Sequence, residues 1–142
     1  MYYGYKISDY TADLARRAEE DCREVFRKID ENALIHNFNL IKEKSGGGKI
    51  FAVVKGNAYG HDYVPVAKTA LEAGATRLAV AFLDEALVLR RAGITEPILV
   101  LGPSPPRDIN VAAENDVALT VFQKEWVDEA IKLWDGSSTM KY

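Results

Sequence analysis

A repeated unit of a short apolar strand, a polar loop and a helix most constrains the fold of this 142-residue chain. The strands are apolar at consecutive positions, which is typical of parallel strands that are covered on both faces. Helix endings with a glycine recur one unit apart, in Ala73-Gly74-Ala75-Thr76 and in Ala92-Gly93-Ile94-Thr95. The predicted strands are residues 50–55, 78–82, 97–101 and 117–122, and the predicted helices are residues 64–73, 84–92, 107–114 and 124–134.

Repeated βα units with short connections predict a parallel α/β architecture. Right-handed crossovers place the carboxyl ends of all strands on one side, which carries the chemistry in a (β/α)8 barrel. The sequence contains four such units, whereas a full barrel has eight and typically about 250 residues. We therefore expect a parallel (β/α) barrel of the TIM type, of which only about the first half is present.

The segments at the two ends of the sequence differ from this repeat. Residues 1–24 are polar and charged, and we expect them to form an N-terminal extension. Residues 25–134 would form the barrel part. Residues 135–142 carry small and polar side chains, and we expect them to form a flexible tail.

Acidic residues mark several predicted helix starts. Asp30 is expected to cap a helix over residues 30–44, which follows a short strand over residues 25–29. Asp84 is a plausible N-cap, so capping explains Asp84 and Glu85 better than an acid pair does. Asp62 could likewise cap the helix that follows it.

Composition and charge exclude several classes of function. A net charge of -3 gives no electrostatic footprint for nucleic acid, and no apolar run approaches the roughly 18 residues needed to cross a bilayer. The segment Met1–Lys6 lacks the apolar region of a signal peptide. Cys22 is the only cysteine, and the two histidines offer no metal site. These absences favour a cytoplasmic location.

Lys55 is the candidate catalytic residue. It ends an apolar run at the mouth of a predicted strand, and the loop Gly56-Asn57-Ala58-Tyr59-Gly60-His61 follows it. Burial lowers the pKa of a lysine because the charged form is poorly solvated, and the neutral amine can form a Schiff base with an aldehyde. The alternative is a lysine that extends into solvent. The loop that follows Lys55 favours the first interpretation.

The string Val53-Val54-Lys55-Gly56-Asn57-Ala58-Tyr59-Gly60-His61 resembles the cofactor-binding signature of the alanine racemase family. Residues 25–37, 78–86 and 98–102 resemble that family as well, so the resemblance spans roughly residues 25–132. It implies that Lys55 holds pyridoxal 5′-phosphate as a Schiff base and acts as the base on one face of the amino acid. It also implies that the Tyr59 hydroxyl is directed to the cofactor phosphate.

Four further residues bear on this candidate site. Val53 and Leu101 complete the expected cofactor-binding residues; alternation along its strand turns Leu101 inward, with ordinary core packing as the alternative. His61 could lie near the cofactor entrance, although a hydrogen bond to nearby backbone is the favoured interpretation. Asp62 departs from the family pattern, which usually has glycine at this position.

The resemblance implies racemisation of L-alanine to D-alanine, an isomerase reaction that supplies cell-wall precursors. Because a half-barrel exposes unpaired strand edges and apolar inner faces, we expect a homodimer. In the family the second base is a tyrosine of a C-terminal domain that acts across the dimer interface. We therefore expect negligible activity from this chain alone. Three alternatives stay open: a racemase of another small amino acid such as serine, a non-catalytic pyridoxal phosphate-binding module, and a folded remnant that associates through its open sheet.

Overall fold

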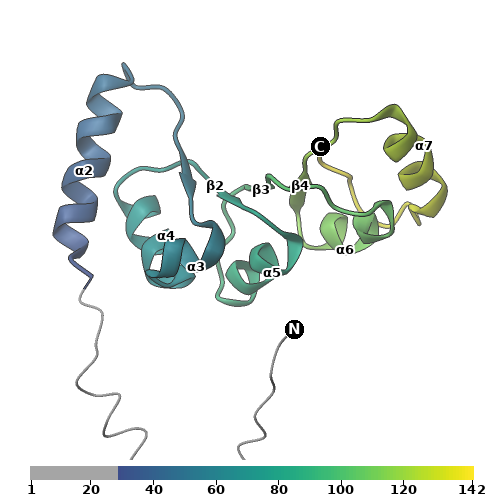
Figure 1. The fold of residues 1–142 in the computed structure, drawn as a ribbon, viewed down its shortest axis with the longest axis horizontal. Helices are drawn as coiled ribbons and strands as arrows, with labels where there is room; N and C mark the ends of the chain where they lie inside the picture. The colour runs from purple at the N-terminus through teal and green to yellow at the C-terminus, as the bar shows by residue number, and fades with distance from the viewer. Residues whose placement is uncertain (1–28) are drawn as a thin grey trace, which may run out of the picture.

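A computed structural model describes residues 29–142 and shows one sheet of four parallel strands (Figure 1). The strands follow the chain order β1-β2-β3-β4, which confirms the predicted parallel α/β architecture. The predicted extension over residues 1–24 and nearly all of the predicted strand over residues 25–29 lie outside the described residues. The strands are β1 Phe51–Val53, β2 Arg77–Val80, β3 Ile98–Val100 and β4 Val117–Leu119.

Helices alternate with these strands as the sequence predicts. In Figure 1 helices α3 to α6 lie along one side of the sheet, and α2 and α7 stand at its two ends. The predicted helix over residues 107–114 is divided into a 3₁₀ turn and a shorter α-helix. No helix of the described residues is both long and apolar enough to cross a membrane. The helical elements are α2 Glu31–Lys44, α3 Lys55–Gly60, α4 Tyr63–Glu72, α5 Leu83–Arg91, η2 Pro106–Asp108, α6 Ile109–Glu114 and α7 Lys124–Leu133.

The helix caps agree only in part with the sequence analysis. The prediction for Asp30 is confirmed, since its carboxylate accepts a hydrogen bond from the Ala33 amide at 3.1 Å. The prediction for Asp84 is wrong, because α5 starts earlier and its N-cap is Phe82. Asp62 occupies the N-cap of α4, but its side chain makes no capping hydrogen bond.

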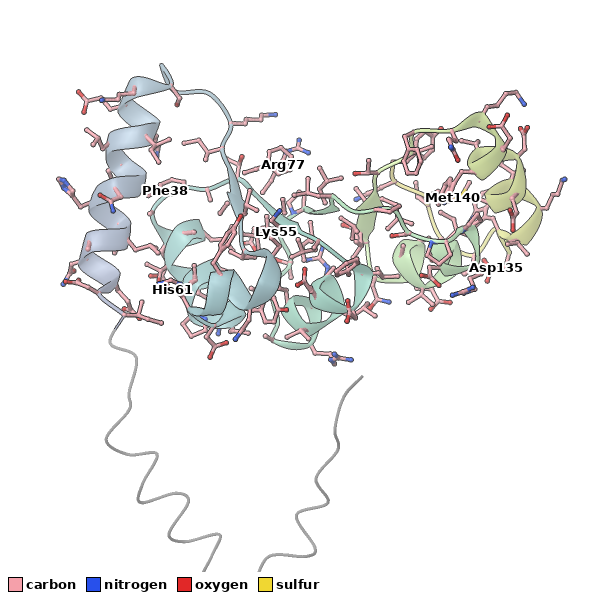
Figure 2. All side chains as sticks on the ribbon, viewed as in Figure 1. Phe38, Lys55, His61, Arg77, Asp135 and Met140 are labelled. Atoms are coloured by element: carbon pink, nitrogen blue, oxygen red, sulfur yellow. The ribbon has the colours of Figure 1, made fainter. Side chains whose placement is uncertain are left out.

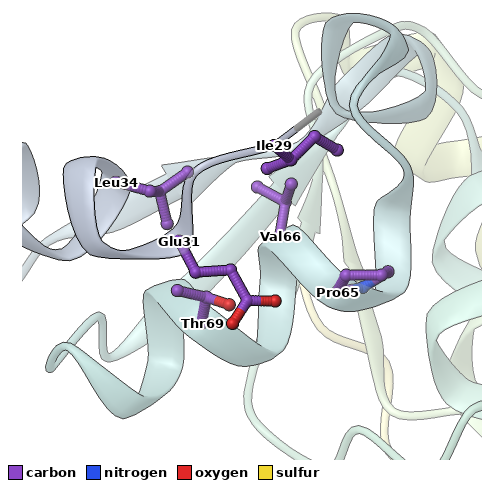
Figure 3. Close-up of a pocket in the computed structure, with 6 residues that line it drawn as sticks. All are labelled: Ile29, Glu31, Leu34, Pro65, Val66 and Thr69. Carbon is purple, nitrogen blue, oxygen red and sulfur yellow. The ribbon is translucent and has the colours of Figure 1, made fainter. Parts of the chain in front are cut away.

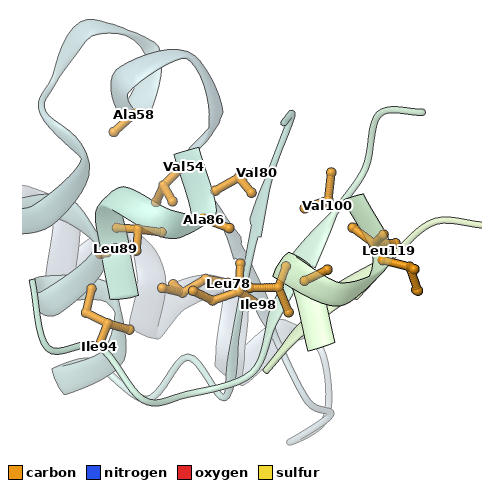
Figure 4. Packing of buried hydrophobic residues seen from close by; sticks show 14 of the residues in the cluster. Val54, Ala58, Leu78, Val80, Ala86, Leu89, Ile94, Ile98, Val100 and Leu119 are labelled. Carbon is orange, nitrogen blue, oxygen red and sulfur yellow. The ribbon is translucent and has the colours of Figure 1, made fainter. Parts of the chain in front are cut away.

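The hydrophobic core lies between the sheet and helices α4 to α7. Parallel pairing aligns Leu78, Ile98 and Val117 in one row, and each is at most 1% exposed. Val80, Val100 and Leu119 form a second row of the same kind. Figure 4 shows these rows packed against α5 and its neighbours. Burial of this face fixes the register, because a shift by one residue would turn the rows to the other side.

The opposite face of the sheet is open within the described residues. Phe51, Val53 and Leu101 are 42%, 41% and 42% exposed. The guanidinium of Arg77 lies 5.6 Å from the centre of the Phe51 ring on this face. The apolar runs predict cover on both faces, whereas the described helices cover only one. This arrangement, with helices outside and an apolar inner face, is part of a TIM-type barrel.

Residues 135–142, for which the sequence predicts a flexible tail, make specific contacts. Lys141 forms a parallel bridge with Ala118, and its carbonyl accepts the Leu119 amide at 3.0 Å. The Lys141 amine also pairs with the Asp116 carboxylate. Met140 packs against the core, on the α7 side of the molecule in Figure 2. This segment therefore covers part of the outer edge of β4.

The side chain of Arg90 joins the segments at the amino ends of β3 and β4. Its guanidinium donates to the carbonyls of Ile94, Glu96 and Asn115 at 2.8–2.9 Å, and to that of Asp116 at 3.0 Å. Burial lowers the pKa of Arg90, and the nearby acids Asp116 and Glu96 oppose that shift. Four loop carbonyls thus share one cationic donor at the end of the sheet away from Lys55.

Candidate functional site

Lys55 stands where β1 ends. The amide of Val54 donates to the Ala79 carbonyl at 2.9 Å, so the pairing with β2 extends one residue past the strand. Lys55 is half-buried, and Figure 2 shows it beside the end of β1. The carboxyl ends of parallel strands are where α/β folds place their ligands. The predicted position of Lys55 at the mouth of an apolar strand is therefore confirmed.

Two of the predicted cofactor-binding residues share the open face next to this position. Val53 pairs with Ala79, and Ala79 pairs with Leu99. Leu101 lies two residues beyond Leu99, so alternation turns both leucines to the side of Val53. With strands about 4.8 Å apart and a rise of about 3.3 Å per residue, the backbones at Val53 and Leu101 stand roughly 12 Å from one another across the sheet. The candidate site thus combines Lys55, at the end of β1, with the apolar side chains of Val53 and Leu101 on the open face of the sheet.

The turn after Lys55 has an unusual backbone. Gly56, Asn57, Ala58 and Tyr59 have φ of 61°, 56°, 51° and 54°, so four successive residues are left-handed. This conformation costs about 1–2 kcal/mol for each residue other than glycine. Glycine and asparagine are the residues that tolerate it best, which accounts for Gly56 and Asn57. Ala58 and Tyr59 are residue types that disfavour this conformation, so the sequence does not predict it there. Strain of this kind is concentrated at functional sites.

Several contacts hold the strained turn. The Ala58 methyl is buried in the core, and its amide donates to the Val54 carbonyl at 2.8 Å. Asn57 accepts the Asp62 amide on its carbonyl at 2.9 Å and the Tyr63 amide on its side chain at 3.0 Å. Asn57, rather than Asp62, therefore caps α4, because the left-handed turn brings its amide group to the helix start.

His61 and Tyr59 have different surroundings. The Nδ1 atom of His61 lies 3.0 Å from the Ala58 carbonyl, which agrees with the interpretation of a loop histidine bonded to backbone. Figure 2 shows His61 well away from Lys55. Tyr59 is 64% exposed, so its hydroxyl is free to meet a ligand from solvent. The role predicted for Tyr59 stays a prediction.

Sequence analysis treats Glu85 as a capping residue only and does not predict its contacts beyond its own helix. Glu85 is 8% exposed, and its carboxylate accepts the Gly56 amide at 2.8 Å, next to Lys55. It also accepts the Tyr63 hydroxyl at 3.0 Å and the amides of Ala81 and Phe82 at 2.6 and 3.3 Å. Burial raises the pKa of Glu85, but these hydrogen bonds together lower it below its ordinary value. Burial, and then the bond to Glu85, raise the pKa of Tyr63.

A cavity of about 120 Å³ lies elsewhere, between the start of α2 and α4 (Figure 3). The side chains around it are mostly apolar, with Glu31 and Thr69 as its polar members. None of the predicted site residues lines this cavity. The candidate chemistry therefore stays at the rim of β1. The lining residues are Ile29, Glu31, Leu34, Pro65, Val66 and Thr69.

Fold and site together define a class: a piece of a (β/α) barrel with a lysine at the carboxyl end of a barrel strand. The model of the family described as alanine racemase, N-terminal domain, matches residues 29–140. The chain belongs to this family, as the resemblance of the lysine string implies.

Individual relatives agree with this assignment. The alanine racemase of Geobacillus kaustophilus is 52% identical over 125 residues, which cover 87% of this chain and 33% of that protein. The crystal structure of alanine racemase from Bacillus anthracis with bound L-Ala-P is 79% identical, with a TM-score of 0.78 over 83% of this chain and 32% of that one. The histidine racemase of Leuconostoc mesenteroides is 40% identical, with a TM-score of 0.74 over 78% of this chain and 30% of that one. The chain thus spans about a third of the length of its relatives.

Proposed function

We propose that this chain is the cofactor-binding part of a pyridoxal phosphate-dependent racemase that interconverts L- and D-alanine. The observation that carries the proposal is the position of Lys55, at the carboxyl end of a parallel strand and beside an open apolar face. Membership of the alanine racemase family supports the choice of reaction and substrate.

The residues at this rim fit pyridoxal phosphate. A lysine amine is the group that bonds the cofactor's aldehyde carbon. The exposed Tyr59 hydroxyl is a hydrogen-bond donor suited to a phosphate oxygen. Val53 and Leu101 present apolar surface on the same side of the sheet, which suits a flat aromatic ring. These four residues would hold the cofactor.

When bound, the cofactor withdraws electrons from the amino acid's α-carbon and so makes its proton acidic. Lys55 would remove and return this α-proton at Nζ on one face of the substrate. Tyr59 would orient the phosphate, and Val53 and Leu101 would keep water from the reacting centre. Inversion needs a second proton-transfer group on the opposite face, which the family resemblance assigns to a separate C-terminal domain.

The remaining parts of the proposal concern the biological setting. We place the protein in the cytoplasm, as a homodimer, where D-alanine would enter cell-wall synthesis. The names of the matched relatives support the reaction, and the open sheet face supports an assembly that covers it.

A racemase of a different amino acid is a second candidate. The similarity to the histidine racemase structure, at 40% identity and a TM-score of 0.74, favours it, because that protein is named for a different amino acid. An assay with alanine, serine and histidine separates the two candidates when this chain is joined to the C-terminal domain that the family resemblance implies. Fastest turnover of serine or histidine would replace alanine as the proposed substrate.

The binding step is tested by incubating the protein with pyridoxal phosphate and reducing with borohydride. We expect a visible absorbance band before reduction and a stable adduct on Lys55 by peptide mass spectrometry. Lys55→Ala should lose both signals. Lys68→Ala, which removes an exposed amine from α4, should keep them. Absence of label on Lys55 in the unmodified protein would refute the proposed function.

A further inference from the structure

A single buried carboxylate gathers hydrogen bonds from three separate segments around Lys55. On one side Glu85 Oε1 accepts the Gly56 amide at 2.8 Å and the Tyr63 hydroxyl at 3.0 Å. On the other side Oε2 accepts the amides of Ala81 and Phe82 at 2.6 and 3.3 Å. An ionised carboxylate only accepts hydrogen bonds, so four donors match its chemistry. Glu85 thus connects the turn after β1 with the end of β2 and the start of α4.

Helix capping does not account for this arrangement. A glutamate at this position of α5 needs only the amide of the N-cap residue Phe82, which is the longest of the four contacts. The bond to Gly56 spans 29 residues of sequence and is much shorter. It reaches the peptide group that directly follows Lys55. The carboxylate is therefore placed to act on the turn and not only on its own helix.

The turn needs such an anchor because its conformation is unfavourable by itself. Its residues from Gly56 to Tyr59 are left-handed, and Lys55 is the residue at which the chain leaves the sheet to enter it. Fixing the Gly56 amide fixes the plane of the Lys55–Gly56 peptide bond. This in turn limits the directions in which the Lys55 side chain can leave the backbone.

We propose that Glu85 is a positioning residue, whose carboxylate aims the Lys55 amine at the ligand by holding the Gly56 amide. The inference rests on the proposed function of Lys55 and assigns to Glu85 a role beyond helix capping. Glu85→Gln disrupts this set of hydrogen bonds with little change in shape, because glutamine has one acceptor oxygen and its NH₂ group would face the donors on one of the two sides.

The test labels the protein with limiting pyridoxal phosphate and borohydride and compares the label on Lys55 with that on the exposed Lys124 and Lys132. In Glu85→Gln we expect a roughly tenfold lower share on Lys55, because small misplacements strongly reduce reactivity. A general loss of stability would instead raise the label on all lysines. Tyr63→Phe is the matched control, since it removes one hydrogen bond from the same carboxylate but leaves the Gly56 amide bound.

Amide hydrogen exchange supplies an independent readout. The Gly56 amide should be as protected as the Ala81 amide in the unmodified protein, and roughly tenfold less protected in Glu85→Gln. An unprotected Gly56 amide in the unmodified protein would overturn the proposal even if the variant does not fold. An unchanged share of label on Lys55 in folded Glu85→Gln would overturn it as well. If the unmodified protein takes no label on Lys55, the proposed function fails, while the exchange data still decide the role of Glu85.

Discussion

At the scale of single residues, Asp62 is the clearest case of backbone strain without compensation. It is exposed, has φ of 81° and makes no capping hydrogen bond with its side chain. We predict that Asp62→Gly raises the free energy of unfolding by about 1 kcal/mol, because relief of the left-handed strain exceeds the entropy that glycine adds to the unfolded chain. Thermal unfolding should then shift upwards by roughly 5 °C.

Asp62→Ala is the control for this prediction. It removes the same charge but keeps the Cβ atom, so it should leave the melting temperature nearly unchanged. Equal stabilisation by alanine and glycine would show that charge, and not backbone conformation, sets the cost at this position.

Residue-level prediction from the sequence succeeded where the signal is local. The position of Lys55 follows from an apolar run and the loop after it, and the cap at Asp30 follows from the first turn of its helix. The hydrogen bond between Glu85 and Gly56 could not be predicted, because the two residues lie 29 positions apart in the sequence. Nor could the left-handed conformation of Ala58, whose residue type disfavours it.

At the scale of elements, Arg90 joins α5 to the loops that precede β3 and β4. We predict that Arg90→Met lowers the free energy of unfolding by about 2–3 kcal/mol, because four carbonyls lose a charged donor. Chemical denaturation measures this change. Arg91→Met, on the exposed side of the same helix, should change the stability little. A similar loss in both variants would mean that helix charge, and not the carbonyl contacts, is responsible.

The boundary between β2 and α5 differs from the prediction made from the sequence. Residues 81 and 82 continue the apolar run of β2 and are predicted as strand, yet their amides turn to the Glu85 carboxylate. Apolar character cannot distinguish the end of a strand from the cap of the next helix, because the N-cap residue Phe82 is itself apolar although it is 59% exposed. The order and direction of the strands depend on the repeated units and were predicted correctly.

At the scale of the whole molecule, the open face of the sheet and the outer edge of β1 leave apolar surface exposed within the described residues. β1 has no strand on its outer side among the described residues. Exposed strand edges and apolar patches promote association. We predict that the chain self-associates over a concentration series in sedimentation velocity, and that Phe51→Glu shifts the distribution towards monomer.

Val111→Glu is the matched control, because Val111 is similarly exposed, at 41%, on α6. It should leave association unchanged. A monomer at all concentrations, or an equal effect of both substitutions, would contradict an interface on the open face. The sequence could not predict which face is open, since consecutive apolar residues indicate burial on both sides.

The guanidinium of Arg90, at the amino ends of β3 and β4, and the turn after Lys55, at the carboxyl end of β1, lie at opposite ends of the same sheet. Substitutions near Arg90 can therefore raise the stability of the fold, while substitutions near Lys55 can change which ligand is bound. Engineering of substrate choice would begin from variants that are stabilised near Arg90, because stabilising substitutions at that end need not move the Lys55 side chain.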